Sequence, residues 1–252
     1  MFPLRDDNPT LSTSVATFAI IGVNAAAWLL VQGLGTEPAL SRSVCTLGAI
    51  PGDLLGLVPA GTEIPIGPDT VCVVGGEPRM VTVLTSMFMH GGWFHILGNL
   101  WFLYVFGDNV EDAMGPLRFL VFYLLCGVAA VAAQTWSNPA SPVPLVGASG
   151  AIGGVMGAYA VLYPRAPVHL LVFLGFYVDR IAVPAVLMLG YWFLLQLLGG
   201  VPALASTGGG VAFWAHVGGF VAGLALIFVF RDPMRVAAHQ QHLRLARARR
   251  WQ

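Results

Sequence analysis

The chain has 252 residues, of which 57% are hydrophobic and only 10% are charged, whereas soluble domains carry about 25% charged residues. So few charges cannot cover the surface of a water-soluble globule, and the composition therefore excludes a cytosolic enzyme, a disordered chain and a nucleic-acid binder. Twelve Arg balance 12 acidic residues, and Lys is absent, so the overall charge by itself indicates no partner.

Six apolar runs in the sequence are candidates for membrane-spanning helices. A spanning helix needs about 20 mostly apolar residues, because each residue adds about 1.5 Å toward roughly 30 Å of hydrocarbon. Each run is bounded by Gly, Pro or charged residues, as helices usually are. The runs cover residues 13–31, 95–110, 117–133, 149–163, 181–198 and 211–230. We therefore expect an all-α, polytopic membrane protein built as a six-helix bundle.

The placement of arginine predicts the orientation of this bundle. If the N-terminus is cytoplasmic, ten of the twelve Arg lie in cytoplasmic segments and only Arg42 and Arg79 lie outside, in agreement with the positive-inside rule. We expect residues 1–12 to be a cytoplasmic N-terminus, residues 13–230 a membrane domain, and residues 231–252 a basic cytoplasmic tail that contacts anionic lipid headgroups. The acidic leader MFPLRDDNPT favours a retained first helix over a cleaved signal peptide. Arg without Lys, together with abundant Ala, Gly and Val, points to a GC-rich bacterium and hence to its inner membrane.

Two connecting segments are unusual. A long extracytoplasmic loop, residues 33–89, is rich in Gly and Pro, and long loops in compact domains are often functional. It holds Cys45 and Cys72, for which a disulfide and two free thiols are both compatible with the sequence. On the cytoplasmic side, the apolar part of residues 165–180 is too short to span, so we expect it to lie along the membrane interface or in a shallow re-entrant position.

A few polar residues stand in or beside the apolar runs. Polar and ionisable groups inside a membrane are costly, so each is a candidate for function. Taken singly, each also has a structural explanation, such as packing or a hydrogen bond to the helix backbone. The candidates are His90, His95 and Asn99 in MHGGWFHILGN, Ser149 in GASG, and His216 in AHVGG.

Glycine spacing predicts which helices meet. Small residues four apart let two membrane helices approach closely, and one such pair lies three residues after His216. Contact between the fourth and sixth helices would bring Ser149 within reach of His216. The spaced pairs are Gly150 with Gly154, Gly153 with Gly157, and Gly219 with Gly223.

This set of residues permits acyl-transfer chemistry. A serine hydroxyl needs an adjacent base, and His216 could remove its proton and later protonate the leaving amine. The apolar runs carry no Asp or Glu at their centres, so a dyad is more economical than a triad. The His95 imidazole, the Asn99 amide and the backbone N–H of Ser149 could stabilise the oxyanion.

The runs HGGWFHILGN, GASG and AHVGG together resemble the motifs of the rhomboid intramembrane serine proteases. The resemblance implies a six-helix bundle that cuts single-pass membrane proteins within or near their transmembrane segments, with no cofactor and no metal. By motif position, Ser149 would be the nucleophile, His216 the base, and His95 and Asn99 the oxyanion donors. The expected structural residues are His90, Gly147, Gly150 and Gly219 near the site, and Glu111 as an anchor between segments.

Two departures from the family pattern concern the surroundings of the site. Some members carry an aromatic residue that packs on the imidazole four positions after the serine, where this chain has Gly153. The tryptophan–arginine pair often seen in the first loop is also missing, and Glu77, Pro78 and Arg79 stand nearby. The group that orients His216 is therefore open at this point.

Two other functions are compatible with a polytopic chain. A non-catalytic relative would bind transmembrane helices without cutting them, although such a protein would typically have lost the serine or the histidine. A small transporter would normally show paired repeats and an ionisable pathway near the midplane, which the sequence lacks. Transmembrane proteins and membrane lipid are the expected partners, and no oligomeric state is predicted.

Overall fold

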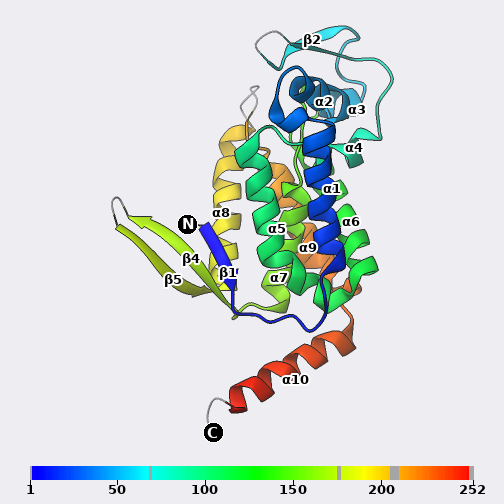
Figure 1. The fold of residues 1–252 in the computed structure, drawn as a ribbon. Coiled ribbons are helices and arrows are strands. Elements are labelled where there is room, and N and C mark those ends of the chain that lie inside the picture. Colours follow the sequence, from blue (N-terminus) through cyan, green and yellow to red (C-terminus); the bar gives the residue numbers. More distant parts are fainter. Residues whose placement is uncertain (1, 68–69, 175–176, 205–209, 250–252) are drawn as a thin grey trace.

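The computed structural model describes residues 2–67, 70–174, 177–204 and 210–249, and most of them are helical. A helix lies at each of the six apolar runs of the sequence, and these helices pack together (Figure 1). Within the described residues, three of the six, α6, α8 and α9, are long and apolar enough to cross a membrane, while α1 and α7 are apolar but shorter. The helices are α1 (Val15–Leu30), α5 (Trp93–Met114), α6 (Pro116–Ser137), α7 (Ser149–Leu162), α8 (Ala185–Ala203) and α9 (Phe213–Phe230).

Close glycine contacts hold α7 against α9. A Cβ atom on Gly219 would lie 1.9 Å from the carbonyl oxygen of Gly150, and a Cβ on Gly223 would lie 1.9 Å from that of Gly154. No side chain larger than hydrogen fits at either position, which confirms the predicted contact between the fourth and sixth helices. Helix α7 is buried almost along its whole length, and its first residue is Ser149.

The expectation of an all-α fold is wrong in one region. The strands β1 (Phe2–Asp6), β4 (Pro167–Leu174) and β5 (Tyr177–Pro184) form an antiparallel sheet in the order β1-β4-β5, beside the lower end of α8 in Figure 1. The segment expected to lie in the interface or to be re-entrant is thus a β-hairpin, with Leu170 opposite Ile181. As a result α8 begins at Ala185 rather than at residue 181, because residues 181–184 belong to β5.

The first loop folds into a small cap at one end of the bundle (Figure 1). A disulfide joins Cys45 to Cys72, which decides between the two alternatives left by the sequence. The cap is hydrogen-bonded to the segment that leads into α7, because Ala49 and Leu145 exchange backbone N–H to carbonyl bonds of 3.0 and 2.7 Å. Its elements are η1 (Gly33–Gly35), α2 (Ala39–Leu47), α3 (Pro51–Leu54), β2 (Thr62–Pro65), β3 (Val71–Val74), α4 (Thr82–Thr85) and η2 (Ser86–Phe88).

The opposite end of the bundle is tied together by buried polar groups. Glu111, near the end of α5, accepts hydrogen bonds from the backbone N–H groups of Ala16 and Thr17 at 2.9 and 2.7 Å. A carboxylate at a helix N-terminus is favoured by the helix dipole, and this contact matches the anchoring role expected for Glu111. Helix α10 (Pro233–Arg249) leaves the bundle at this end, away from the cap (Figure 1).

Candidate active site

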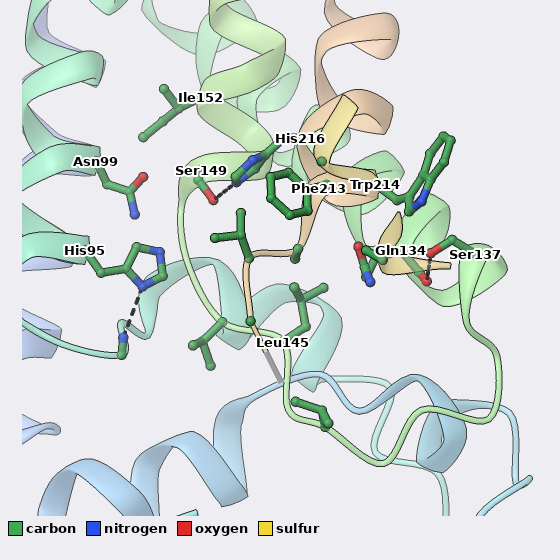
Figure 2. Close-up of a pocket in the computed structure, with 18 of the residues that line it drawn as sticks. His95, Asn99, Gln134, Ser137, Leu145, Ser149, Ile152, Phe213, Trp214 and His216 are labelled. Atoms are coloured by element: carbon green, nitrogen blue, oxygen red, sulfur yellow. Dashed lines mark hydrogen bonds between the residues drawn. The ribbon is translucent and has the colours of Figure 1, made fainter. Parts of the chain in front are cut away.

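A cavity of about 900 Å³ lies between the helices on the cap side of the bundle. Its lining comes from α5, α6, α7, α8 and α9 and from the segment that precedes α7. Figure 2 shows that Ser149 and His216 face His95 and Asn99 across this space. The structure therefore brings together, around one cavity, the four residues to which the sequence assigned chemistry.

Ser149 is the first residue of α7, and just before it the backbone turns tightly and comes close to His95. Gly147 has a φ of +127°, and a Cβ atom there would lie 2.6 Å from Nε2 of His95. Only glycine fits this backbone position without strain. The N–H of Gly147 donates to the carbonyl oxygen of Ser86 at 2.9 Å, which fixes the turn to the cap. The serine side chain is thereby directed into the cavity (Figure 2).

His216 contacts two polar side chains, one through each ring nitrogen. Its Nε2 lies 2.8 Å from Oγ of Ser149, and its Nδ1 lies 2.8 Å from Oε1 of Gln196 on α8. The close approach of α7 and α9 makes the first contact possible, because the two residues are 67 positions apart in the chain. A histidine in this position can accept a proton from the serine hydroxyl.

An aromatic ring does pack beside His216, and it comes from α8. The rings of Trp192 and His216 have centroids 5.7 Å apart, tilted by 38°. A Cβ atom on Gly153 would lie 3.1 Å from the carbonyl oxygen of His216 and 3.7 Å from the Trp192 ring. The Trp192 ring thus lies next to the position from which an aromatic side chain at residue 153 would project.

Gln196 and Trp192 are the residues near the site that the sequence analysis missed. The available signal was the single Gln in the apolar run YWFLLQLLGG, because an uncharged polar group in a membrane helix also needs a hydrogen-bond partner.

His95 and Asn99 lie one turn apart on α5 and face the same way. The N–H of Gly91 lies 3.2 Å from Nδ1 of His95, and since a backbone N–H can only donate, Nδ1 accepts. In the neutral ring the proton is then on Nε2, the nitrogen nearest to Gly147 and Ser149. The amide nitrogen of Asn99 is buried and has no hydrogen-bond partner within the described residues. Two side chains of α5 with donor nitrogens therefore line the same cavity as Ser149.

His90 lies beside the site rather than in it. It is fully buried, and its ring contacts the His95 ring edge-on, with centroids 5.2 Å apart. Its backbone N–H donates to Oε1 of Gln32 at 2.8 Å, and the Gln32 amide donates back to its carbonyl oxygen at 2.8 Å. Gly150 likewise lies behind Ser149, where a Cβ atom would be 2.4 Å from that of Ala130. His90 and Gly150 thus pack behind the site, and their structural roles stay predictions.

Fold and site together define a class: a mostly helical membrane protein with a serine and a histidine in hydrogen-bond contact inside a cavity. The family model of the Rhomboid domain matches residues 77–233, which is more than half of the chain. The match includes the four residues to which the sequence assigned chemistry, His95, Asn99, Ser149 and His216. The chain belongs to the rhomboid family and is an integral membrane protein, as the resemblance of its motifs indicated.

Known relatives agree with this assignment. The mitochondrial rhomboid protein 1 of Saccharomyces cerevisiae is 27% identical over 68% of this chain and 47% of its own length. Rhomboid-like protease 5 of Toxoplasma gondii is 34% identical over 60% of this chain and 16% of its own length. The rhomboid protease GluP of Bacillus subtilis is 34% identical over 50% of this chain and 26% of its own length. The chain thus spans about half or less of the length of these relatives.

Proposed function

We propose that this protein is a serine endopeptidase that cleaves transmembrane segments of single-pass membrane proteins, with Ser149 as nucleophile and His216 as general base. The observation that carries the proposal is the 2.8 Å contact between Oγ of Ser149 and Nε2 of His216, inside a cavity large enough for an unwound peptide. Two relatives are named as proteases, which supports the same reaction class.

The positions of these atoms support the following reaction. As Oγ of Ser149 attacks a peptide carbonyl carbon, its proton passes to Nε2 of His216. The imidazolium then protonates the leaving amine, and the substrate remains as an ester on Ser149. Water, deprotonated by the same nitrogen, hydrolyses the ester and regenerates the serine. The cavity beside the two side chains provides the space through which that water reaches the ester.

The negative oxygen of the tetrahedral intermediate needs preorganised donors. We assign this role to the amide nitrogen of Asn99, to Nε2–H of His95 and to the backbone N–H of Ser149. The start of α7 adds the positive end of its helix dipole. An unpartnered buried amide costs free energy in the resting protein, so the unpaired nitrogen of Asn99 supports a role in which the substrate supplies its acceptor.

The proposed orientation places both termini in the cytoplasm of a bacterium and the cap outside the inner membrane. The Cys45–Cys72 disulfide supports this orientation, because disulfides persist in oxidising compartments. The basic tail starts at the opposite end of the bundle (Figure 1), where contact with anionic headgroups is expected. Substrate helices must unwind before attack, so small residues at the cut and helix-breaking residues nearby are expected.

Cleavage in proteoliposomes tests the proposal. A single-pass substrate with a Gly/Ala-rich transmembrane segment should be cut by the wild type and left intact by Ser149→Ala and His216→Ala. Ser137→Ala is the matched control, since this serine lines the same cavity but donates to the backbone carbonyl of Gln134 at 2.8 Å, and it should cut normally. Wild-type cleavage by folded Ser149→Ala would refute the assignment, whereas equal capture of an uncut helix by both proteins would favour a non-catalytic binder.

A further inference from the structure

Gln196 is a buried polar side chain in the middle of an apolar helix. Its relative exposure is only 8%, so its amide must find partners within the protein. Its Nε2 donates to the carbonyl oxygen of Trp192, one turn earlier in α8, at 3.2 Å. Its Oε1 lies 2.8 Å from Nδ1 of His216. The amide is thus used at both ends, and one of its partners is the imidazole of the proposed dyad.

These contacts define the tautomer of His216. Because the amide nitrogen faces a carbonyl oxygen, the atom that faces His216 is the amide oxygen, which can only accept. Nδ1 must therefore carry the proton. In the neutral ring Nε2 then has a free lone pair, and this is the nitrogen that faces the hydroxyl of Ser149. The opposite tautomer would set two lone pairs against each other at Nδ1 and leave Nε2 unable to act as a base.

The position of Gln196 is held by contacts on both sides along α8. One turn before it, the Trp192 ring packs on the His216 ring and near the ring of Phe220, with centroids 6.0 Å apart. One turn after it, the indole N–H of Trp214 donates to the carbonyl oxygen of Gly200 at 3.0 Å. Helix α8 therefore meets α9 on both sides of the amide, so the Gln196 oxygen is fixed relative to the imidazole.

We propose that Gln196 is a positioning residue that sets the tautomer and orientation of His216. This inference rests on the proposed function of the Ser149–His216 pair. It assigns to a neutral amide the role that a carboxylate has in a serine–histidine–aspartate triad. A neutral group suits this place, because an ionised side chain buried in a membrane helix is costly.

The test compares two substitutions at position 196 in the full-length protein in detergent. Gln196→Leu keeps the approximate volume but removes the acceptor, whereas Gln196→Glu keeps an oxygen that can accept from Nδ1. The readout is the rate at which a fluorophosphonate probe labels Ser149. We expect Gln196→Leu to slow labelling about tenfold to a hundredfold and Gln196→Glu to label within about threefold of wild type. A merely structural role predicts the reverse order, since leucine suits an apolar helix and a carboxyl group does not.

A spectroscopic measurement makes the result independent of folding differences. With ¹⁵N-labelled histidine, the difference between the wild-type and His216→Ala spectra gives the His216 signals. We expect a protonated Nδ1 and an unprotonated Nε2 in the wild type, and a mixture of tautomers in Gln196→Leu. Leu198→Ala, at an exposed position on the same helix, is the control and should match wild type in both measurements.

The outcomes separate this inference from the proposed function. If wild-type labelling requires His216 but Gln196→Leu labels at the wild-type rate with Nδ1 still protonated, the positioning role is overturned and the dyad stands. If the probe labels Ser149 equally fast in the wild type and in His216→Ala, the proposed dyad is wrong. Slow labelling with mixed tautomers in Gln196→Leu, and recovery in Gln196→Glu, support the positioning role.

Discussion

Asn99 lines the same cavity as Ser149, and its amide nitrogen is buried with no hydrogen-bond partner within the described residues. Such a group destabilises the resting protein, and its place in the lining of the cavity is the reason for proposing it as an oxyanion donor. His95 supports the same site differently, since Gly91 fixes its tautomer and so directs Nε2–H toward the serine. At the scale of single residues, the proposed site therefore combines one nucleophile, one base and two donors, and the contacts of neighbouring residues hold them.

Asn99→Ala should lower kcat by about 10²- to 10³-fold, because removal of one oxyanion donor costs about 2.7–4 kcal/mol of barrier. Thermal stability should stay the same or rise, since the substitution also removes an unpaired polar group. Kinetics of substrate cleavage and thermal unfolding in detergent measure both effects. Asn138→Ala, at another position in the lining of the cavity, should leave kcat unchanged. A normal kcat in Asn99→Ala would show that the oxyanion is stabilised elsewhere.

The sequence was enough to select four residues that line one cavity, because histidine, serine and asparagine are rare in apolar runs. Gln196 could not be placed, since its role depends on the register between α8 and α9, and the loop between them gives no local signal for that register. The Cys45–Cys72 disulfide likewise required the fold of the cap, because the spacing of two cysteines does not define a pair.

At the scale of helices, the contact between α7 and α9 decides whether the site exists. Ser149 and His216 belong to these two helices, and their backbones touch at Gly150 and Gly219. Any separation of the helices would break the 2.8 Å contact between Oγ and Nε2. The contact between Ser149 and His216 therefore depends on the close packing that Gly150 and Gly219 allow.

Gly219→Ala should destabilise the protein and abolish cleavage. The added Cβ would lie 1.9 Å from the carbonyl oxygen of Gly150, and overpacking of this kind typically costs about 1–3 kcal/mol. Gly190→Ala on α8 is the matched control, because no described heavy atom lies within 4 Å of its added Cβ. We expect a lower unfolding temperature only for Gly219→Ala. Equal unfolding temperatures in the two variants would contradict the close packing of α7 and α9.

The helices were easier to predict than the strands. Runs of about 20 apolar residues leave few alternatives, and each of the six runs contains a helix. The hairpin β4–β5 was missed because a short apolar run such as VHLLVFL fits a strand and an interfacial segment equally well. Its pairing with β1 joins residues more than 160 positions apart, which no local pattern reveals.

At the scale of the whole molecule, the N-terminal strand links the sheet to the bundle. The indole N–H of Trp101 on α5 donates to the carbonyl oxygen of Pro3 at 2.6 Å, and the hydroxyl of Tyr159 on α7 donates to the carboxyl group of Asp6. Strand β1 pairs with β4 on its other side. The N-terminal residues therefore connect α5, α7 and the hairpin.

Asp6 makes this link dependent on pH. Burial raises the pKa of Asp6 from 3.8 to about 6, and the hydrogen bond from Tyr159 opposes part of this rise. Between about pH 4 and 6 the folded state thus binds a proton at Asp6 more tightly than the unfolded state does. The contribution of Asp6 to the free energy of unfolding is therefore fully present below pH 4 and is lost as the pH rises to 6. The expected change in unfolding free energy is on the order of 1–3 kcal/mol.

Unfolding at several pH values measures this effect. Between about pH 4 and 6, the free energy of unfolding of the wild type should fall relative to that of Asp6→Asn, which has no carboxyl group to titrate at this position. Glu77→Gln, at an exposed position in the cap, should follow the wild-type curve. Parallel curves for wild type and Asp6→Asn would show that the carboxyl group titrates normally.

The central claim is that the fold activates one serine among the many in the chain. Labelling of the purified protein with a fluorophosphonate probe, followed by mass spectrometry, tests it without knowledge of the substrate. We predict a single adduct on Ser149 that is lost in His216→Ala, while the variant keeps the wild-type unfolding temperature. Folded wild-type protein that gives no adduct on Ser149, or an adduct that forms equally well in His216→Ala, would contradict the claim.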